Sequence, residues 1–292
     1  MEKSPPLLTL GMLVYNEEKH VDEAIKSILN QTYQNFILII SDNASTDQTA
    51  EICRRYANQD KRIVFVRQEK NRGGSFNALY LLNKTTTPFF MYCGGHDKWH
   101  PQFIEKLLPI IQENKDLVLI YPRTRQVKSD GSLGSIYQDD YTTTEMHDSS
   151  QRYLFLLKNL HFSNMFYGIW RTEILKNCDF KHIWGADVNI ILQAALFGKF
   201  KQYHSVLLFE RIVDRERRTY CQHFIATHGY RPKFCSPIVL HLQFIFETIK
   251  ILYRTDFKLT TISKLKLSIE TAKKLIMDLI SVVVRKILGK QE

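Results

Sequence analysis

The sequence predicts an α/β protein in which a mostly parallel sheet is flanked by helices and followed by a helical C-terminal tail. Apolar runs of strand length alternate with helical patterns over the first 120 residues, as in successive βαβ units. Three of these runs end in polar clusters that contain carboxylates, at Glu17, Asp42 and Asp97. Because parallel strands present their carboxyl ends at one edge of a sheet, we expect these clusters to form one site.

Local patterns justify the individual elements of this first part. Val21–Leu29 places its apolar side chains on one helical face. Ser45 or Asp47 is a suitable N-cap for the next helix, and Pro101 suits the first turn of another. Strands are expected at residues 8–14, 36–40, 63–66, 88–93 and 117–121, and helices at residues 21–29, 47–56, 75–82 and 101–114.

The pattern changes after Tyr121. Residues 129–132 read Ser-Asp-Gly-Ser and predict a turn between two extended segments. Helices are expected at residues 151–159, after Arg171, and at residues 188–197, where Gly198 is expected as the C-cap. A short strand is expected at residues 206–209.

The tail from Pro237 onward has no strand pattern and predicts two or three helices. We therefore expect a main domain at residues 1–220 and a helical, basic, amphipathic extension at residues 221–292. An apolar stripe in the tail is accompanied by lysines that mostly lie off it. Such a stripe can pack on the main domain or on a second subunit, or it can lie on an anionic membrane surface, and the sequence leaves these alternatives open. The stripe consists of Ile262, Leu265, Ile269, Ala272, Ile276, Leu279, Val283 and Ile287.

Composition limits the classes of function. The net charge of +10 fits an acidic partner such as a nucleotide or a phospholipid surface, but the sequence has no recognised nucleic-acid motif. The five cysteines are odd in number and include no C-x-x-C pair, which indicates a reducing compartment. There is no signal-peptide pattern and no apolar run long enough to span a membrane. We expect a cytoplasmic protein, with peripheral contact at the inner membrane face still open.

An ordered series of motifs resembles the family 2 glycosyltransferases, which are inverting enzymes of the Rossmann-like GT-A fold. No G-x-G-x-x-G follows the first strand, so the dinucleotide-binding fingerprint is absent. The resemblance covers residues 8–215. It rests on five segments that occur in this order, namely residues 14–18 (Val-Tyr-Asn-Glu-Glu), 41–47 (Ser-Asp-Asn-Ala-Ser-Thr-Asp), 71–74 (Asn-Arg-Gly-Gly), 94–97 (Gly-Gly-His-Asp) and 185–187 (Gly-Ala-Asp).

The resemblance implies a site for a nucleotide-diphosphate sugar. Asp42 would bind the base, usually uracil. Trp184 would close over the sugar or the acceptor, or it would be an aromatic residue of the core. An arginine after the last strand, represented here by Arg211, would contact the diphosphate. The base and ribose would be lined by Tyr15, Asn16 and Glu17, and the nucleotide would lie beside Asn71, Arg72 and Gly73.

The resemblance also implies Mn²⁺ or Mg²⁺ as a cofactor, bound after the fourth strand. Asp97 supplies an oxygen ligand of the kind that hard cations prefer. His96 stands where the family commonly has a second acid, and a histidine ligand would favour Mn²⁺. This departure leaves a metal-independent or degenerate site as an alternative.

The family's general base is an Asp that precedes a helix, and Asp187 matches that position. It would remove the proton from the acceptor hydroxyl, although Asp187 could instead be only the N-cap of its helix. The expected enzyme transfers a sugar, with inversion, to a glycan or lipid-linked acceptor, as in cell-envelope polysaccharide synthesis. The alternative is a non-catalytic module that binds nucleotide sugars.

Overall fold

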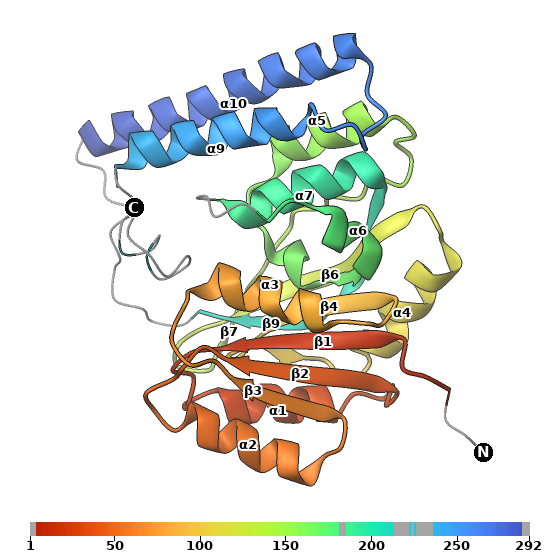
Figure 1. Cartoon of the computed structure of the whole chain (residues 1–292), viewed down its shortest axis with the longest axis vertical. Coiled ribbons are helices and arrows are strands. Elements are labelled where there is room, and N and C mark those ends of the chain that lie inside the picture. Colours follow the sequence, from red (N-terminus) through yellow and green to blue (C-terminus); the bar gives the residue numbers. More distant parts are fainter. Residues whose placement is uncertain (1–3, 181–184, 213–221, 223–224, 226–235, 288–292) are drawn as a thin grey trace.

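The computed structural model describes residues 4–180, 185–212, 222, 225 and 236–287. The described part contains a nine-stranded sheet of order β3-β2-β1-β4-β8-β6-β9-β5, with β7 paired to β6 (Figure 1). The strands are β1 (Leu8–Val14), β2 (Phe36–Asp42), β3 (Ile63–Arg67), β4 (Phe89–Gly94), β5 (Lys98–Trp99), β6 (Leu117–Val127), β7 (Leu133–Ile136), β8 (Ile169–Arg171) and β9 (Lys199–Arg211). The helices are α1 (Val21–Leu29), α2 (Thr49–Gln59), α3 (Gly74–Lys84), α4 (Phe103–Glu113), α5 (Ser149–Asn159), α6 (Thr172–Asn177), α7 (Ala186–Phe197), α9 (Pro237–Ile251) and α10 (Thr261–Ile287), with a 3₁₀ turn at Asn164–Tyr167.

The strand order reverses between β1 and β4. The chain adds β2 and β3 on one side of β1 and then places β4 on the other side, all four parallel. The register pairs Val14 with Asp42 and Leu13 with Gly94, so the three strands end level with one another. Ligands of open α/β sheets bind in the crevice at such a reversal, beyond the carboxyl ends of the strands. The predicted edge is therefore present in the structure.

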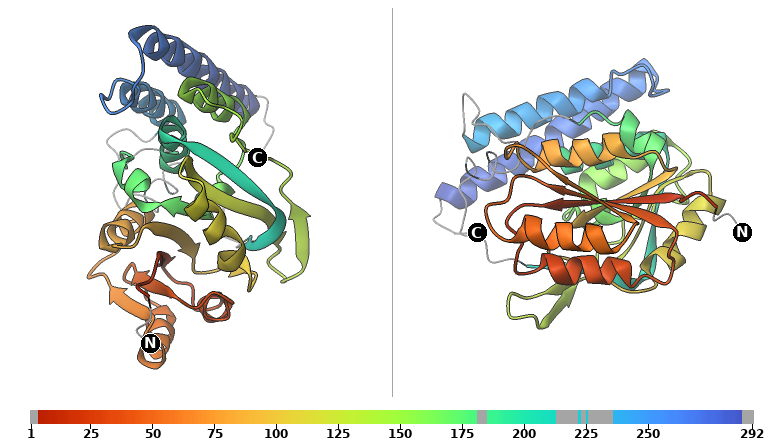
Figure 2. Two further views of the ribbon diagram at one scale, coloured as in Figure 1. Left: turned by 90° about the vertical axis from the view of Figure 1, so that its right-hand side faces the viewer. Right: turned by 60° about the horizontal axis from the view of Figure 1, so that its bottom comes forward.

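Helices cover both faces of the sheet (Figures 1 and 2). One buried cluster includes Ile25 of α1, Cys53 of α2 and Leu107 of α4. The other includes Leu81 of α3 and Ile191 of α7, together with side chains of α5 and α6. The strands between the two clusters are buried on both faces, which explains why their sequences are nearly continuous apolar runs.

The C-terminal helices pack on the second of these layers. Thr248 of α9 accepts a hydrogen bond from Asn189 of α7 at 3.0 Å. The hydroxyl of Thr271 on α10 lies 2.8 Å from the Tyr153 hydroxyl on α5. The helical tail is therefore confirmed in the described range, where α9 and α10 form it.

Of the alternatives for the tail's apolar stripe, packing on the main domain does not hold for four of its residues. Ile262, Leu265, Ile269 and Ile276 are exposed, by between 45% and 81%. The buried face of α10 uses Leu267 and the polar residues Ser268 and Thr271 instead. The hydroxyls on this face bond to backbone carbonyls one turn back in the helix, so burial costs them little.

Some element boundaries also differ from expectation. β9 begins at Lys199 rather than at 206, and β6 continues to Val127, where the predicted turn joins it to β7. Gly198 is the C-cap of α7, as predicted, but its backbone is extended, with φ −169°, rather than left-handed. A Cβ at this position would lie 2.3 Å from Cγ1 of Val118, which is a steric reason for glycine.

Candidate active site

The loops after β1 and β4 touch at the point where the strand order reverses. Nδ1 of His96 lies 2.9 Å from Oε1 of Glu17. A Cβ on Gly95 would come within 2.8 Å of Cγ1 of Val14 and 3.1 Å of Cγ of Glu17, so only glycine allows this approach. The structure therefore brings two of the predicted site residues into direct contact.

Asp97 is buried beside this pair. Its Oδ1 accepts the backbone N–H of Arg211 at 3.0 Å and lies 4.0 Å from Nε2 of His96. Burial raises the pKa of the Asp97 carboxyl above its ordinary value, and nearby His96 opposes the rise. A buried carboxylate with few partners carries a desolvation cost that a cation would relieve.

Arg211 makes two polar contacts with its side chain beside the 96–97 turn. Its guanidinium bonds to Oε2 of Glu23 at 2.7 Å and to the backbone oxygen of His96 at 3.3 Å. The side chain is only 9% exposed. In this structure Arg211 braces the 96–97 turn against α1, and contact with a diphosphate stays a prediction.

Glu210 and Tyr137 also lie near Asp97, although the sequence did not point to them. Burial raises the pKa of Glu210, with nearby Asp97 adding to the rise, and burial raises the pKa of Tyr137 to about 12. Oε2 of Glu210 is buried and has no hydrogen-bond partner among the described residues. The expected strand stopped at residue 209, so Glu210 was not recognised as a strand-end carboxylate.

The loop that follows β2 is organised around Asp42. The Asp42 carboxylate is fully buried and accepts hydrogen bonds from the backbone N–H and the hydroxyl of Ser45. Arg67, the last residue of β3, places Nε 3.5 Å from Oδ2 of Asp42 and donates to the Ser45 backbone oxygen at 2.8 Å. Asp42 therefore shapes the loop, and the half-exposed Arg67 covers it.

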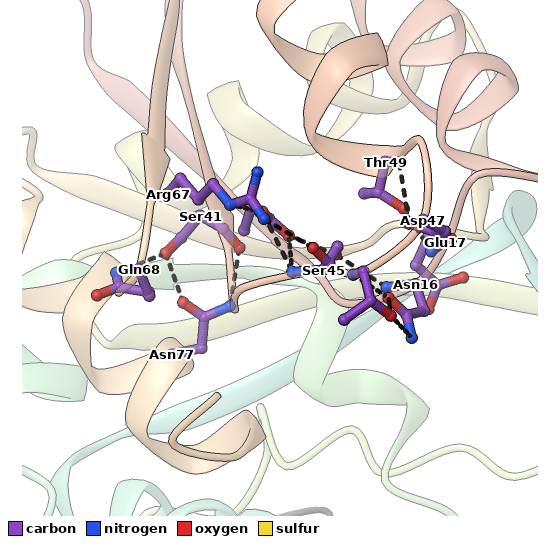
Figure 3. Close-up of polar contacts among 11 residues, drawn as sticks. Asn16, Glu17, Ser41, Ser45, Asp47, Thr49, Arg67, Gln68 and Asn77 are labelled. Carbon is purple, nitrogen blue, oxygen red and sulfur yellow. Dashed lines mark hydrogen bonds and ion pairs between the residues drawn. The ribbon is translucent and has the colours of Figure 1, made fainter. Parts of the chain in front are cut away.

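Asn16 joins the loops that follow β1 and β2. It adopts a left-handed backbone with φ +54°, which Asn tolerates better than most residues. Its backbone N–H donates to the Ser45 hydroxyl at 3.0 Å, and its Oδ1 accepts the Thr46 N–H at 2.8 Å (Figure 3). Tyr15 beside it is 42% exposed. The first loop thus presents its side chains next to the Asp42 loop.

The 71–74 turn is tied to the same edge through Asn43. The Asn43 side chain donates to Oδ1 of Asn71 at 2.9 Å and accepts the Arg72 backbone N–H at 3.0 Å. Gly73 has φ +84°, which favours glycine, and precedes α3. The guanidinium of Arg72 lies over the Phe76 ring at 4.7 Å.

A buried polar network under these loops was not expected from the sequence. Nδ2 of Asn77 donates to the Ser41 backbone oxygen at 2.8 Å, and its Oδ1 accepts the Ser41 hydroxyl (Figure 3). Gln68 donates to the same hydroxyl at 3.0 Å. The polar residues at the ends of β2 and β3 could have indicated this network, because buried polar groups require hydrogen-bond partners.

Asp187 lies in the first turn of α7 and is half-buried. The N-cap of this helix is Gly185, in a left-handed conformation with φ 72°, so Asp187 is not the cap. Figure 1 shows the N-terminal end of α7 on the same side of the molecule as the carboxyl ends of the parallel strands. Asp187 bonds to none of the described site residues, and Trp184 lies outside the described residues.

The residues around Asp97 suit a cation whose ligands come partly from the protein and partly from the substrate phosphates better than a cation held by protein side chains alone. Among the described residues, no group of three or more His, Cys, Asp or Glu side chains is arranged to hold a metal ion. Asp97 and His96 offer two donors, and Glu17 on Nδ1 turns His96 Nε2 toward Asp97, as in metal-ligating histidines. Mg²⁺ sites commonly combine one or two carboxylates with substrate phosphates.

The family assignment follows from sequence comparison. The model of glycosyl transferase family 2 matches residues 9–178, which is more than half of the chain. The chain therefore belongs to glycosyl transferase family 2 and is a glycosyltransferase. An uncharacterized glycosyltransferase of Methanocaldococcus jannaschii, MJ1057, is 26% identical over 268 residues, covering 86% of this chain and 90% of that protein. Because these relatives are named as glycosyltransferases, the comparison favours an enzyme over a non-catalytic module that binds nucleotide sugars.

Solved structures share the GT-A fold. The S. aureus protein TarS (residues 1–349), in complex with UDP-GlcNAc, superposes with a TM-score of 0.67 at 18% identity, covering 91% of this chain and 72% of that one. The mannosyltransferase PcManGT from Pyrobaculum calidifontis, in complex with GDP-Man and Mn²⁺, gives a TM-score of 0.57 at 16% identity, covering 99% and 89%. At these identities the likeness establishes the fold alone.

Proposed function

We propose that this glycosyltransferase transfers a sugar, with inversion, from a nucleotide-diphosphate donor, most simply a UDP-sugar, to a hydroxyl of a glycan or lipid-linked acceptor. The main supporting observation is the contact of Glu17 with His96 beside buried Asp97, at the reversal of strand order. TarS and PcManGT, which share the fold, were solved with nucleotide sugars.

The nucleoside would lie against the loops after β1 and β2. Tyr15 and Asn16 are exposed there, and Asn71, Arg72 and Gly73 border the same edge through Asn43. Recognition of the base by Asp42 requires Arg67 to move aside or to join in, because Asp42 itself is covered. A carboxylate beside a guanidinium offers both an acceptor and donors to the edge of a uracil.

The diphosphate would lie near Asp97 and His96. A divalent cation bound there supplies positive charge that stabilises the departing diphosphate. Asp97 would hold this cation with the donor phosphates, and His96, oriented by Glu17, would be its second protein ligand. Arg211 would keep the turn in place through its backbone N–H and its bond to Glu23.

Asp187 would act as the general base. It removes the proton from the acceptor hydroxyl while that oxygen attacks the anomeric carbon from the face opposite the diphosphate, which leaves with the bonding electrons. The first turn of α7 favours negative charge through the helix dipole. We propose residues 1–220 as the catalytic unit, acting in the cytoplasm, and residues 221–292 as its extension.

The test is a pair of charge-removing substitutions in first helical turns. Asp187→Asn should lower the transfer rate by about 10²-fold or more while UDP binding measured by calorimetry is retained. Glu51→Gln, in the exposed first turn of α2, is the matched control and should leave both unchanged. Normal turnover in Asp187→Asn would show that another group is the base, and absence of nucleotide binding by the wild type would refute the donor assignment.

A further inference from the structure

The two C-terminal helices each carry a second apolar face that the rest of the described chain does not cover. Figures 1 and 2 show α9 and α10 side by side at one end of the molecule, away from β3. We call their exposed apolar residues the α9–α10 surface. It consists of Ile238, Val239, Leu242, Phe246 and Tyr253 from α9 and its C-terminal end, and Ile262, Leu265, Ile269, Ile276, Met277 and Ile280 from α10.

The exposed apolar residues of α10 begin beside the face that contacts α9 and extend around the helix away from α9. Ser268 contacts Tyr253 at 3.5 Å, which marks the side of α10 that faces α9. At 100° per residue, Leu265 and Ile276 are about 60° and 80° around the helix axis from Ser268. Glu270 lies on the other side, where Lys158 of α5 approaches it at 3.9 Å. Leu265 and Ile276 therefore join the apolar residues of α10 to those of α9. Of the two acids on α10, Asp278 lies away from the surface, and Glu270 borders it beside Met277.

Lysines accompany the apolar residues. Lys266 and Lys273 are exposed and lie within about one turn of Ile262, Ile269 and Ile276 on the helix. The acids of α10 are already paired, Glu270 with Lys273 and Asp278 with Lys274. Over residues 237–287 the sequence has nine Lys and Arg against four Asp and Glu, a net charge of +5.

We propose that the α9–α10 surface docks on an anionic lipid bilayer, with both helices lying in the interface plane. A helix with apolar side chains on one face and lysines beside them binds such a surface through apolar burial and through attraction to anionic headgroups. The helices, of 15 and 27 residues, present about 22 Å and 40 Å of length. No described helix is both long and apolar enough to cross a membrane.

A second copy of the chain fits this surface less well. In a two-fold symmetric contact the same patch meets itself, so Lys266 and Lys273 would approach lysines of the other copy. An anionic bilayer provides the opposite charge along the whole surface. Charge complementarity therefore favours lipid over self-association.

Docking would place the predicted catalytic helix near the lipid. Thr248 on α9 bonds to Asn189 on α7, two residues after Asp187. This consequence rests on the proposed function, because docking on lipid would explain why the acceptor is lipid-linked. Vesicle binding itself does not depend on turnover, so the two can fail separately.

The test is sedimentation of the full chain with vesicles of phosphatidylcholine alone or mixed with phosphatidylglycerol. We expect binding to the mixed vesicles, weakened by salt. The double variant Phe246→Ser/Ile269→Ser should reduce partitioning at least ~10-fold, and Lys266→Glu/Lys273→Glu should reduce the preference for phosphatidylglycerol. The matched control Val64→Ser/Leu133→Ser changes exposed apolar residues on β3 and β7 and should bind as the wild type does.

Calorimetry with UDP and a transfer assay on the same proteins separate the two proposals. Asp187→Asn should lose turnover and still bind vesicles, whereas Phe246→Ser/Ile269→Ser should lose vesicle binding and still bind UDP. Absence of binding to anionic vesicles, or equal binding by Phe246→Ser/Ile269→Ser, would overturn the docking proposal. A wild-type dimer that this variant disperses, without vesicle binding, would overturn it in favour of self-association.

Discussion

Nδ1 of His96 lies 2.9 Å from Oε1 of Glu17, and this contact links the loops on the two sides of the reversal in strand order. The contact fixes the orientation of the imidazole, so that its other nitrogen lies on the side of Asp97, 4.0 Å from Oδ1. A carboxylate partner of this kind selects the tautomer and rotamer of a ligating histidine. In the proposed cation site, His96 would therefore supply one imidazole at the position where the sequence led us to expect a second acid.

The metal preference should depend on His96. We expect His96→Asp to lower the ratio of the Mn²⁺-supported rate to the Mg²⁺-supported rate, because a carboxylate suits Mg²⁺ better than an imidazole does. Transfer or donor hydrolysis, measured with each metal, gives this ratio. The exposed His204→Asp is the control, and an unchanged ratio in His96→Asp would exclude His96 as a ligand.

Asp97→Asn should stabilise the protein while weakening metal-dependent UDP binding. Because burial holds the folded-state pKa of Asp97 above its unfolded value, ionised Asp97 destabilises the fold at neutral pH. Asp97→Asn should raise the free energy of unfolding by roughly 1 kcal/mol, and this gain should reach its full size at pH values above the raised pKa. It should shrink as the pH falls through that pKa and disappear below the unfolded value of about 3.8, where the carboxyl is protonated in both states.

Urea unfolding of the wild type and Asp97→Asn at several pH values measures this gain. Asp60→Asn is an informative control of opposite sign, because a hydrogen bond from Arg62 lowers the pKa of Asp60. Its removal should destabilise the protein at neutral pH and have less effect in acid. A destabilised Asp97→Asn at neutral pH would contradict the view that the ionised Asp97 carboxylate costs folding energy.

Gly94→Ala should displace the Asp97 carboxylate. A Cβ at Gly94 would lie 2.5 Å from Oδ2 of Asp97, which is closer than such contacts occur. We expect metal-dependent UDP binding to weaken about 10-fold, with a loss of stability of about 1–2 kcal/mol. Gly134→Ala on β7 is the control for a tight Cβ contact that does not involve Asp97, since its nearest neighbour would be Cβ of Gln126 at 3.0 Å. Equal UDP binding in Gly94→Ala and wild type would show that the Asp97 position is unimportant.

Arg67 and Asp42 should be energetically coupled. Arg67→Leu removes the cation beside a fully buried carboxylate and should cost about 1 kcal/mol, a value limited by the exposure of Arg67. In an Asp42→Asn background the cost should be smaller, because no buried charge remains. A double-mutant cycle by urea unfolding measures the difference, and additive effects would mean that the two side chains do not interact.

The strands of the first sheet half could be predicted because they are buried on both faces. Residues 36–40 read as an uninterrupted apolar run, and the structure extends it only to Asp42. β8 could not be predicted, since its three residues lie in an aromatic-rich segment without alternation and pair with β4 and β6 from distant parts of the chain. Such pairings are set by tertiary packing, which local patterns do not contain.

The candidate site was predictable in its strand-end residues but not in their partners. Asp42, Asp97 and Glu17 follow apolar runs, and the structure places them at one edge. That Arg67 covers Asp42 depends on the pairing of β3 with β2. On α10, a prediction from hydrophobicity alone picks the apolar stripe, much of which is exposed in the structure. Thr271 and Ser268 are buried instead, because their hydroxyls bond to backbone carbonyls of the same helix.

The packing of α9 on α7 has a consequence for chimeric enzymes. Gly185 lies so close to Phe244 that a Cβ there would be 3.2 Å from the ring, and Asn189 bonds to Thr248. Both contacts flank Asp187, so its helix is held from the far end of the chain. A crossover at residue 220 would pair α7 from one parent with α9 from another and mismatch both contacts. In a chimera made to alter the choice of acceptor, α7 and α9 should therefore come from the same parent enzyme.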